Sequence, residues 1–115
     1  MKKEIKDLLT QVENLGWKVE EEGDNEYRFG KYSPAGQDYS ISVNGETYEE
    51  LMQSIDQAYE DYDVSEETYL WLDNTGHGKN GAPFHMKDVL ADMEACKEMI
   101  LTLSKGLALS NELDY

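Results

Sequence analysis

Hydrophobic residues recur at three- and four-residue steps in three segments of the chain, which is the spacing of one face of an α-helix. The first segment covers residues 3–15 and is followed by Gly16, a residue type that commonly ends helices. The second begins at Thr47, with Glu50 three residues later, as in a capping box. The third occupies residues 86–107. These patterns predict three helices.

Strict alternation of hydrophobic and polar residues lies between the first two predicted helices. Residues 17–20 and 27–29 alternate and are separated by the turn-forming residues 22–25, so they predict a β-hairpin. The sequence Ser-Pro-Ala-Gly at 33–36 predicts a further turn, and residues 39–43 alternate again. Three consecutive strands joined by such short turns predict an antiparallel meander.

Residues 68–72 are hydrophobic or aromatic on both faces, which predicts a fourth and more buried strand. Residues 74–83 contain three glycines and a proline and predict a mobile loop, and residues 110–115 are expected to fray. The chain is therefore expected to be a single α+β domain over residues 1–115. Its element order would be α-β-β-β-α-β-α, with an antiparallel sheet of about four strands packed against helices. The hydrophobic stripe of residues 86–107 would cover the sheet or, alternatively, form a homodimer seam.

Acidic residues outnumber basic ones by 25 to 10, giving a formal net charge of −15. Between Lys31 and Lys79 there is no lysine or arginine, but there are eleven carboxylates, with tyrosines and a tryptophan among them. Disordered acidic tails are poor in aromatic residues, so this stretch should fold and present its charge on the surface. Such a surface repels nucleic acid and anionic membranes and attracts a basic groove. Solubility is the alternative reason for the charge, although about 2–8 charges serve that purpose in a small domain.

The carboxylates of the second predicted helix fall on the side opposite its hydrophobic residues. Helical residues three or four apart have Cβ atoms about 5–6 Å apart, close to the spacing of phosphates along a nucleic-acid strand. The helix therefore predicts a DNA-mimicking surface that binds a basic nucleic-acid-binding protein. The predicted partner-binding residues are Glu46, Glu49, Glu50, Asp56, Glu60, Asp61, Asp63, Glu66 and Glu67.

Catalytic and metal-binding patterns are weak throughout the chain. Residues 61–72 imitate the start of a calcium loop, but Glu66 stands where that loop needs glycine. Residues 76–81 lack the spacing of a phosphate-binding loop. His77 and His85 are not accompanied by a zinc-type ligand cluster. We therefore predict no catalytic residue, metal or cofactor.

The single Cys96 excludes an internal disulfide and lies on the hydrophobic stripe of the last predicted helix. The longest apolar runs are shorter than the roughly 20 residues that span a membrane. No basic segment leading into an apolar one predicts a secretory leader. The expected location is the cytoplasm of a host cell.

Three segments of the chain carry a resemblance to known proteins. They are residues 30–40 (Gly-Lys-Tyr-Ser-Pro-Ala-Gly-Gln-Asp-Tyr-Ser), the Asp-Tyr-Asp of residues 61–63 with Trp71 after it, and residues 78–83 (Gly-Lys-Asn-Gly-Ala-Pro). Over roughly residues 15–107 the chain resembles a family of small acidic proteins of phages and mobile elements in Firmicutes. Members share the Ser-Pro-Ala-Gly-x-Asp turn, the Asp-x-Asp segment, the Gly-x-Pro loop and a closing amphipathic helix.

This resemblance implies a mobile-element setting, in which small acidic proteins act as anti-restriction or anti-CRISPR inhibitors. The implied partner is a basic protein such as a CRISPR effector or restriction enzyme, and no catalytic residues are implied. The loop at residues 74–81 is longer and richer in glycine than is usual in the family. The alternative is a structural or regulatory interaction module, homodimeric through the last helix, whose acidity serves solubility.

Overall fold

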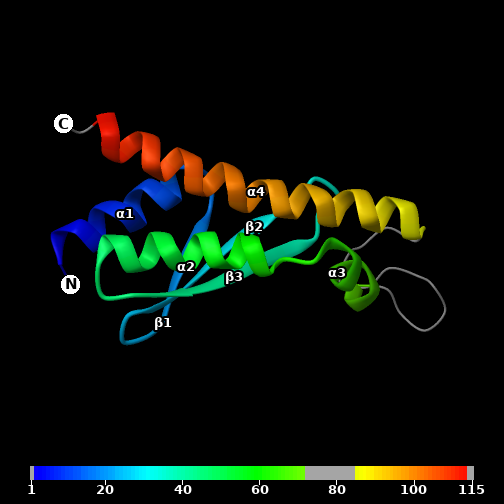
Figure 1. Ribbon diagram of the computed structural model, residues 1–115, viewed down its shortest axis with the longest axis horizontal. Coiled ribbons are helices and arrows are strands. Elements are labelled where there is room, and N and C mark those ends of the chain that lie inside the picture. Colours follow the sequence, from blue (N-terminus) through cyan, green and yellow to red (C-terminus); the bar gives the residue numbers. More distant parts are fainter. Residues whose placement is uncertain (1, 72–84, 114–115) are drawn as a thin grey trace.

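The computed structural model describes residues 2–71 and 85–113 and has an α+β fold (Figure 1). An N-terminal helix precedes three strands and three further helices. In chain order the elements are α1 (Lys3–Asn14), β1 (Lys18–Gly23), β2 (Glu26–Tyr32), β3 (Asp38–Asn44), α2 (Tyr48–Asp61), α3 (Val64–Trp71) and α4 (Met86–Leu113).

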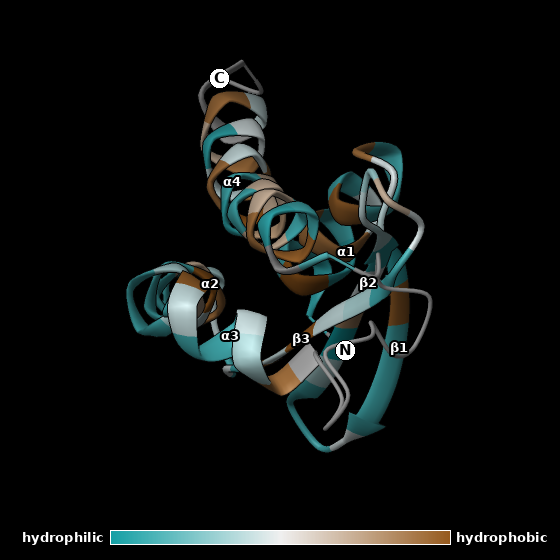
Figure 2. Ribbon diagram, turned by 90° about the vertical axis from the view of Figure 1, so that its right-hand side faces the viewer, coloured by the Kyte–Doolittle hydropathy of each residue, from teal (hydrophilic) through white to brown (hydrophobic). Residues whose placement is uncertain are grey.

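The three strands form one antiparallel sheet in the order β1-β2-β3, so the predicted hairpin and meander are confirmed. Phe29 of the central strand lies opposite Val19 on one side and Ile41 on the other. Phe29 and Ile41 are buried, and the helices cover this face of the sheet (Figure 2). The opposite face carries exposed side chains and is called the outer sheet face: Lys18, Glu20, Glu22, Arg28, Tyr32, Asp38, Ser40 and Ser42.

α4 runs along the whole length of the molecule and packs against α1, α2 and α3 (Figure 1). Six residues of its hydrophobic stripe are buried in the core, each at most 2% exposed: Val89, Met93, Cys96, Ile100, Leu103 and Leu107. Leu90, which the pattern also assigned to the stripe, is 37% exposed. The prediction that this stripe packs within the fold is therefore confirmed. A homodimer seam on the same stripe would require these buried side chains to become exposed. The buried part of the stripe therefore offers no surface for a second copy of the chain.

A buried carboxylate ties α4 to the Ser-Pro-Ala-Gly turn between β2 and β3. Asp92 is 5% exposed and accepts hydrogen bonds from Ser33 Oγ at 2.6 Å and from the backbone N–H of Ala35 at 3.0 Å. It also accepts one from Gln37 Nε2. The turn is closed by a hydrogen bond from Ser33 N to Gln37 O at 2.8 Å, and Gly36 has a φ of 92° that favours glycine. The turn is thus fixed at both its ends and its tip.

The fourth strand predicted at residues 68–72 is wrong over its described part, because Val64–Trp71 forms the helix α3 and the sheet of the described residues has three strands. Asp63 Oδ1 accepts the N–H of Glu66 at 3.1 Å and caps the start of this helix. Thr68 is buried one turn after the half-buried Val64, which gives α3 a helical face. A short apolar run does not separate strand from helix by periodicity alone.

Three further predictions concern the ends of α1 and α4 and the loop at residues 74–83. Gly16 has a φ of 96° and follows α1, as expected of a helix-ending glycine. α4 continues to Leu113, so much of the segment expected to fray is helical. The predicted loop at residues 74–83 lies outside the described residues.

Candidate acidic interaction face

The orientation of α2 is set at its first turn and along its buried side. Thr47 Oγ1 accepts the N–H of Glu50 at 3.1 Å, so the predicted cap is present. The Glu50 carboxylate reaches back to the N–H of Glu46 at 2.9 Å, one residue before the position usual in a capping box. Leu51 and Ile55 are fully buried, which turns the opposite side of α2 outward (Figure 2).

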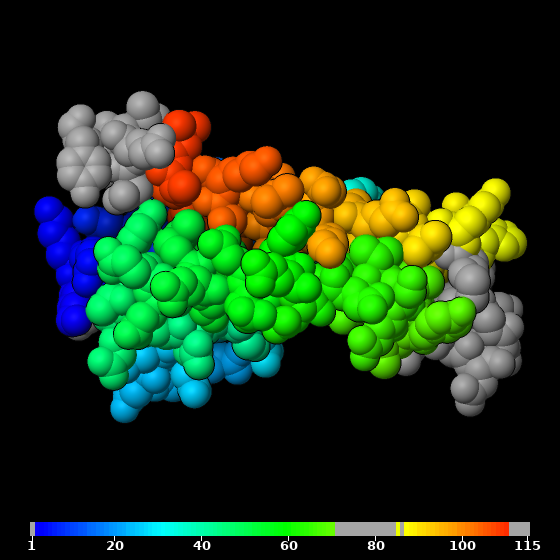
Figure 3. Space-filling view, in the orientation of Figure 1, coloured from blue at the N-terminus to red at the C-terminus, as the bar shows by residue number. Residues whose placement is uncertain are grey.

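The nine predicted partner-binding carboxylates lie along α2, α3 and the residues that begin these two helices. Eight of them are exposed, and Glu67 is half-buried. α2 and α3 follow one another along one long face of the molecule (Figure 3). We call this set the acidic face: Glu46, Glu49, Glu50, Asp56, Glu60, Asp61, Asp63, Glu66 and Glu67.

Some of these carboxylates have structural contacts. Besides the caps formed by Glu50 and Asp63, Asp61 accepts a hydrogen bond from Gln57 Nε2 at 2.8 Å. Asp56 accepts one from Ser104 Oγ at 2.5 Å and so links α2 to α4. These carboxylates therefore make structural hydrogen bonds in addition to contributing negative charge to the acidic face.

Four other carboxylates of the acidic face have no hydrogen-bond or ion-pair partner within residues 2–71 and 85–113: Glu46, Glu49, Glu60 and Glu66. We call them the free carboxylates. They are the members of the acidic face whose charge is most open to a partner.

Lys97 of α4 is a cation that contacts the C-terminal end of α2. Its Nζ donates to the backbone O of Tyr62 at 3.1 Å and lies 5.0 Å from the centre of the Tyr59 ring. Tyr62 is the residue that ends α2, where helix carbonyls carry partial negative charge. Lys97 therefore compensates the end of the helix, and no carboxylate of the described acidic face forms an ion pair with it.

The acidic face extends onto the β1–β2 turn, a part that sequence reasoning missed. Asp24 and Glu26 join Glu46 and Glu50 around an open hollow of about 760 Å³. The backbone N–H of Gly45 donates to the backbone O of Asn25 at 3.0 Å, which holds the turn beside the start of α2. The predicted meander could have indicated this extension, because an antiparallel meander places the first turn beside the end of the third strand.

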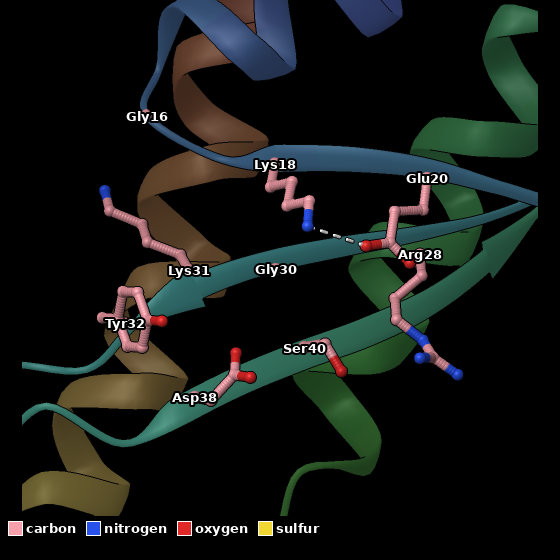
Figure 4. A pocket seen from close by; sticks show the side chains of 9 residues that line it. All are labelled: Gly16, Lys18, Glu20, Arg28, Gly30, Lys31, Tyr32, Asp38 and Ser40. Carbon is pink, nitrogen blue, oxygen red and sulfur yellow. Dashed lines mark ion pairs between the residues drawn. The ribbon is translucent and has the colours of Figure 1, made fainter.

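The outer sheet face contains a second hollow, of about 400 Å³, above Gly30 (Figure 4). Lys18 and Arg28 line it, but each forms an ion pair. Lys18 Nζ lies 3.1 Å from Glu20 Oε1, and Arg28 Nε lies 2.9 Å from Glu22 Oε1. Lys31 also lines this hollow, and its Nζ donates to the backbone O of Leu15 at 3.4 Å. Because its three cations all have partners within the chain, this hollow is a weaker candidate for an interaction site than the acidic face.

The buried thiol and tyrosine hydroxyl groups near α4 have raised pKa values. Burial raises the pKa of the Cys96 thiol to about 12, and the nearby Asp92 carboxylate contributes to the rise. Burial also raises the pKa of the Tyr39 and Tyr62 hydroxyls. All three groups are therefore neutral near pH 7, and a neutral thiol is a poor nucleophile.

Metal ligation has no support in the part of the chain that the structure describes. No group of three or more histidine, cysteine, aspartate or glutamate side chains is arranged there to hold a metal ion. The calcium-loop imitation that begins at Asp61 leads into α3 at Val64, so its residues form a helix and do not wrap around a cation.

None of the helices in residues 2–71 and 85–113 is both long and apolar enough to cross a membrane. No family model, curated protein or solved structure matches the chain. Its function therefore has to be argued from the acidic face.

Proposed function

We propose that this protein is a non-catalytic inhibitor that occupies the nucleic-acid groove of a basic protein with its acidic face. The observation that carries the proposal is the set of free carboxylates on α2, on α3 and just before α2, with no described cation paired to them. A partner with a basic groove supplies the missing cations. The neutral, buried state of Cys96, Tyr39 and Tyr62 agrees with a role that needs no nucleophile.

The dimensions of α2 support binding in place of a nucleic-acid strand. Glu49 and Glu60 lie near its two ends, about 16 Å apart along the axis at 1.5 Å per residue. Phosphates of one DNA strand advance about 3.4 Å along the axis per nucleotide, so this length corresponds to about five nucleotides. Charge pairing with the lysines and arginines of such a groove weakens as salt rises.

The resemblance to phage and mobile-element proteins suggests the class of partner. It favours a host defence protein, such as a CRISPR effector or a restriction enzyme, encountered in the host cytoplasm. Either enzyme class must hold a nucleic acid in a positively charged channel. The acidic face would exclude the DNA or guide from that channel without binding nucleic acid itself.

The test is competition with a labelled DNA duplex for purified Cas9-type effectors and restriction enzymes. The variant reverses three free carboxylates, with Glu49, Glu60 and Glu66 each replaced by Lys. These three leave the structural contacts of Glu50, Asp56, Asp61 and Asp63 intact. The control carries Lys at Glu4, Asp7 and Glu13, exposed positions on α1 that change the net charge equally.

We expect the wild type and the α1 control to displace DNA at about 50 mM salt and much less at about 300 mM salt. The variant on the acidic face should require at least about tenfold more protein, because each reversal turns an attraction into a repulsion. Equal competition by the two triple variants would contradict the proposal, as would failure of the wild type against both enzyme classes.

A further inference from the structure

α3 packs its half-buried Val64 against the core but presents two other large hydrophobic side chains to solvent. Tyr69 is 67% exposed and Leu70 is 55% exposed, whereas the polar Thr68 is 3% exposed. Thr68 can be buried because its hydroxyl donates to the backbone O of Val64 at 2.7 Å. A helix that covers a core normally turns its hydrophobic residues inward. The exposure of Tyr69 and Leu70 leaves them available to something outside the chain.

Carboxylates precede this hydrophobic pair along α3 and the end of α2. Glu66 precedes Tyr69 by three residues and Leu70 by four, so it is their neighbour on the helix surface. Asp63 caps the same helix, and Asp61 ends α2 just before it. The pair is thus continuous with the acidic face and bordered by its charges.

We propose that Tyr69 and Leu70 form the apolar anchor of the acidic face and insert into a hydrophobic depression within the partner's basic groove. This inference rests on the proposed function and specifies the partner's surface. Each exposed charge accelerates encounter and contributes modestly to affinity. Most of the binding energy at an interface comes from a few central residues, among which tyrosine is enriched.

The same charges exclude two other occupants. A second copy of this chain would bring Glu66, Asp63 and Asp61 against the same residues of its partner, between two molecules that each carry a net charge of −15. An anionic membrane surface would repel the face in the same way. A surface that is basic at its rim and apolar at its centre satisfies both the carboxylates and the anchor.

Two synthetic peptides of equal length and charge serve as probes, one of lysine and tryptophan and one of lysine and glycine. The variant carries Tyr69→Ala and Leu70→Ala. The control carries Tyr32→Ala and Leu109→Ala, whose side chains are 71% and 56% exposed but lie on β2 and α4, away from the acidic face. Circular dichroism should show the same unfolding midpoint for all three proteins, because the substituted side chains are exposed.

We expect the wild type and the control to bind the tryptophan peptide at least about tenfold more tightly than the glycine peptide. The α3 variant should bind both peptides equally, at the affinity that the wild type shows for the glycine peptide. An unchanged preference in the variant would overturn the anchor. Concentration-dependent dimers of the wild type that the variant loses, seen by sedimentation velocity, would also overturn it by assigning the pair to a second copy.

The DNA competition assay separates this inference from the proposed function. If Tyr69→Ala with Leu70→Ala competes as well as the wild type, the anchor is wrong and the inhibitor role stands. If no nuclease is inhibited by the wild type but the peptide preference depends on Tyr69 and Leu70, the inhibitor role fails and the anchor stands.

Discussion

The acidic face and the outer sheet face both expose carboxylates to water, but in opposite electrostatic surroundings. On the outer sheet face, Glu20 and Glu22 form ion pairs with Lys18 and Arg28. On the acidic face, Glu49 and Glu60 have no such partner among the described residues. If the negative charge served only solubility, nothing would favour leaving it unpaired on one face and pairing it on the other.

The two arrangements follow from the elements that present them. In the sheet, the register places Arg28 of β2 beside β1, where it pairs with Glu22, and Lys18 pairs with Glu20 two residues along the same strand. On α2, the buried Leu51 and Ile55 send every carboxylate of the stripe to the other side. Charge on β1 and β2 is therefore paired within the sheet, whereas Glu49 and Glu60 of α2 have no ion-pair partner among the described residues.

The largest expected effect on stability is at Asp92, because its carboxylate is buried, unlike the carboxylates compared on the two faces. Replacing it with alanine should lower the free energy of unfolding by about 3 kcal/mol, because three donors on Ser33, Ala35 and Gln37 lose their buried acceptor. Urea unfolding followed by circular dichroism measures the loss. The exposed Asp88, one turn earlier on α4, provides the control Asp88→Ala, which should change stability little. Equal midpoints for both variants would show that the turn does not depend on Asp92.

The sequence predicted α1, the meander, α2 and the long last helix because each has an unambiguous period or a specific cap. Thr47 with Glu50 located the start of α2 correctly, and Gly16 located the end of α1. The exposed positions of the acidic face also followed from the period of α2. These features depend on residues close together in the chain, which sequence patterns report well.

Two of the features that sequence reasoning missed depend on contacts between distant residues, whereas α3 was missed for a local reason. α3 was predicted as a strand because its aromatic and β-branched content outweighed a cap at Asp63 that spans only three residues. The role of Asp92 could not be predicted, because its partners lie between 55 and 59 residues away. The Asp24 and Glu26 extension of the acidic face likewise required the turn to be placed beside Glu46.

A smaller effect should follow from removing the cation at the centre of the outer sheet face. Arg28 contacts both carboxylate oxygens of Glu22, at 2.9 and 3.2 Å. Arg28→Ala should cost about 0.5–1 kcal/mol at low salt, since half-exposed ion pairs contribute about that much and Glu20 and Glu22 then repel each other. Thermal melting measures the loss, with Lys18→Ala as the milder control because the Lys18 side chain is 79% exposed. A variant as stable as the wild type at low salt would remove the contrast between the faces.

The smallest effect is the sharpest test, because its sign should differ between the faces. Glu60 lies one turn after Asp56 and near the negative end of α2, so it destabilises the helix by about 0.2–0.5 kcal/mol. Glu60→Gln should therefore raise the melting temperature at low salt, whereas Glu22→Gln should lower it by breaking the pair with Arg28. Both differences should shrink toward zero in about 1 M salt, where the screening length falls to about 3 Å. The melting temperature of the wild type should rise between low and moderate salt as repulsion on the acidic face is screened. If both variants changed the melting temperature in the same direction, the carboxylates of α2 would be compensated like those of the sheet. The electrostatic argument that the acidic face binds a partner would then be contradicted.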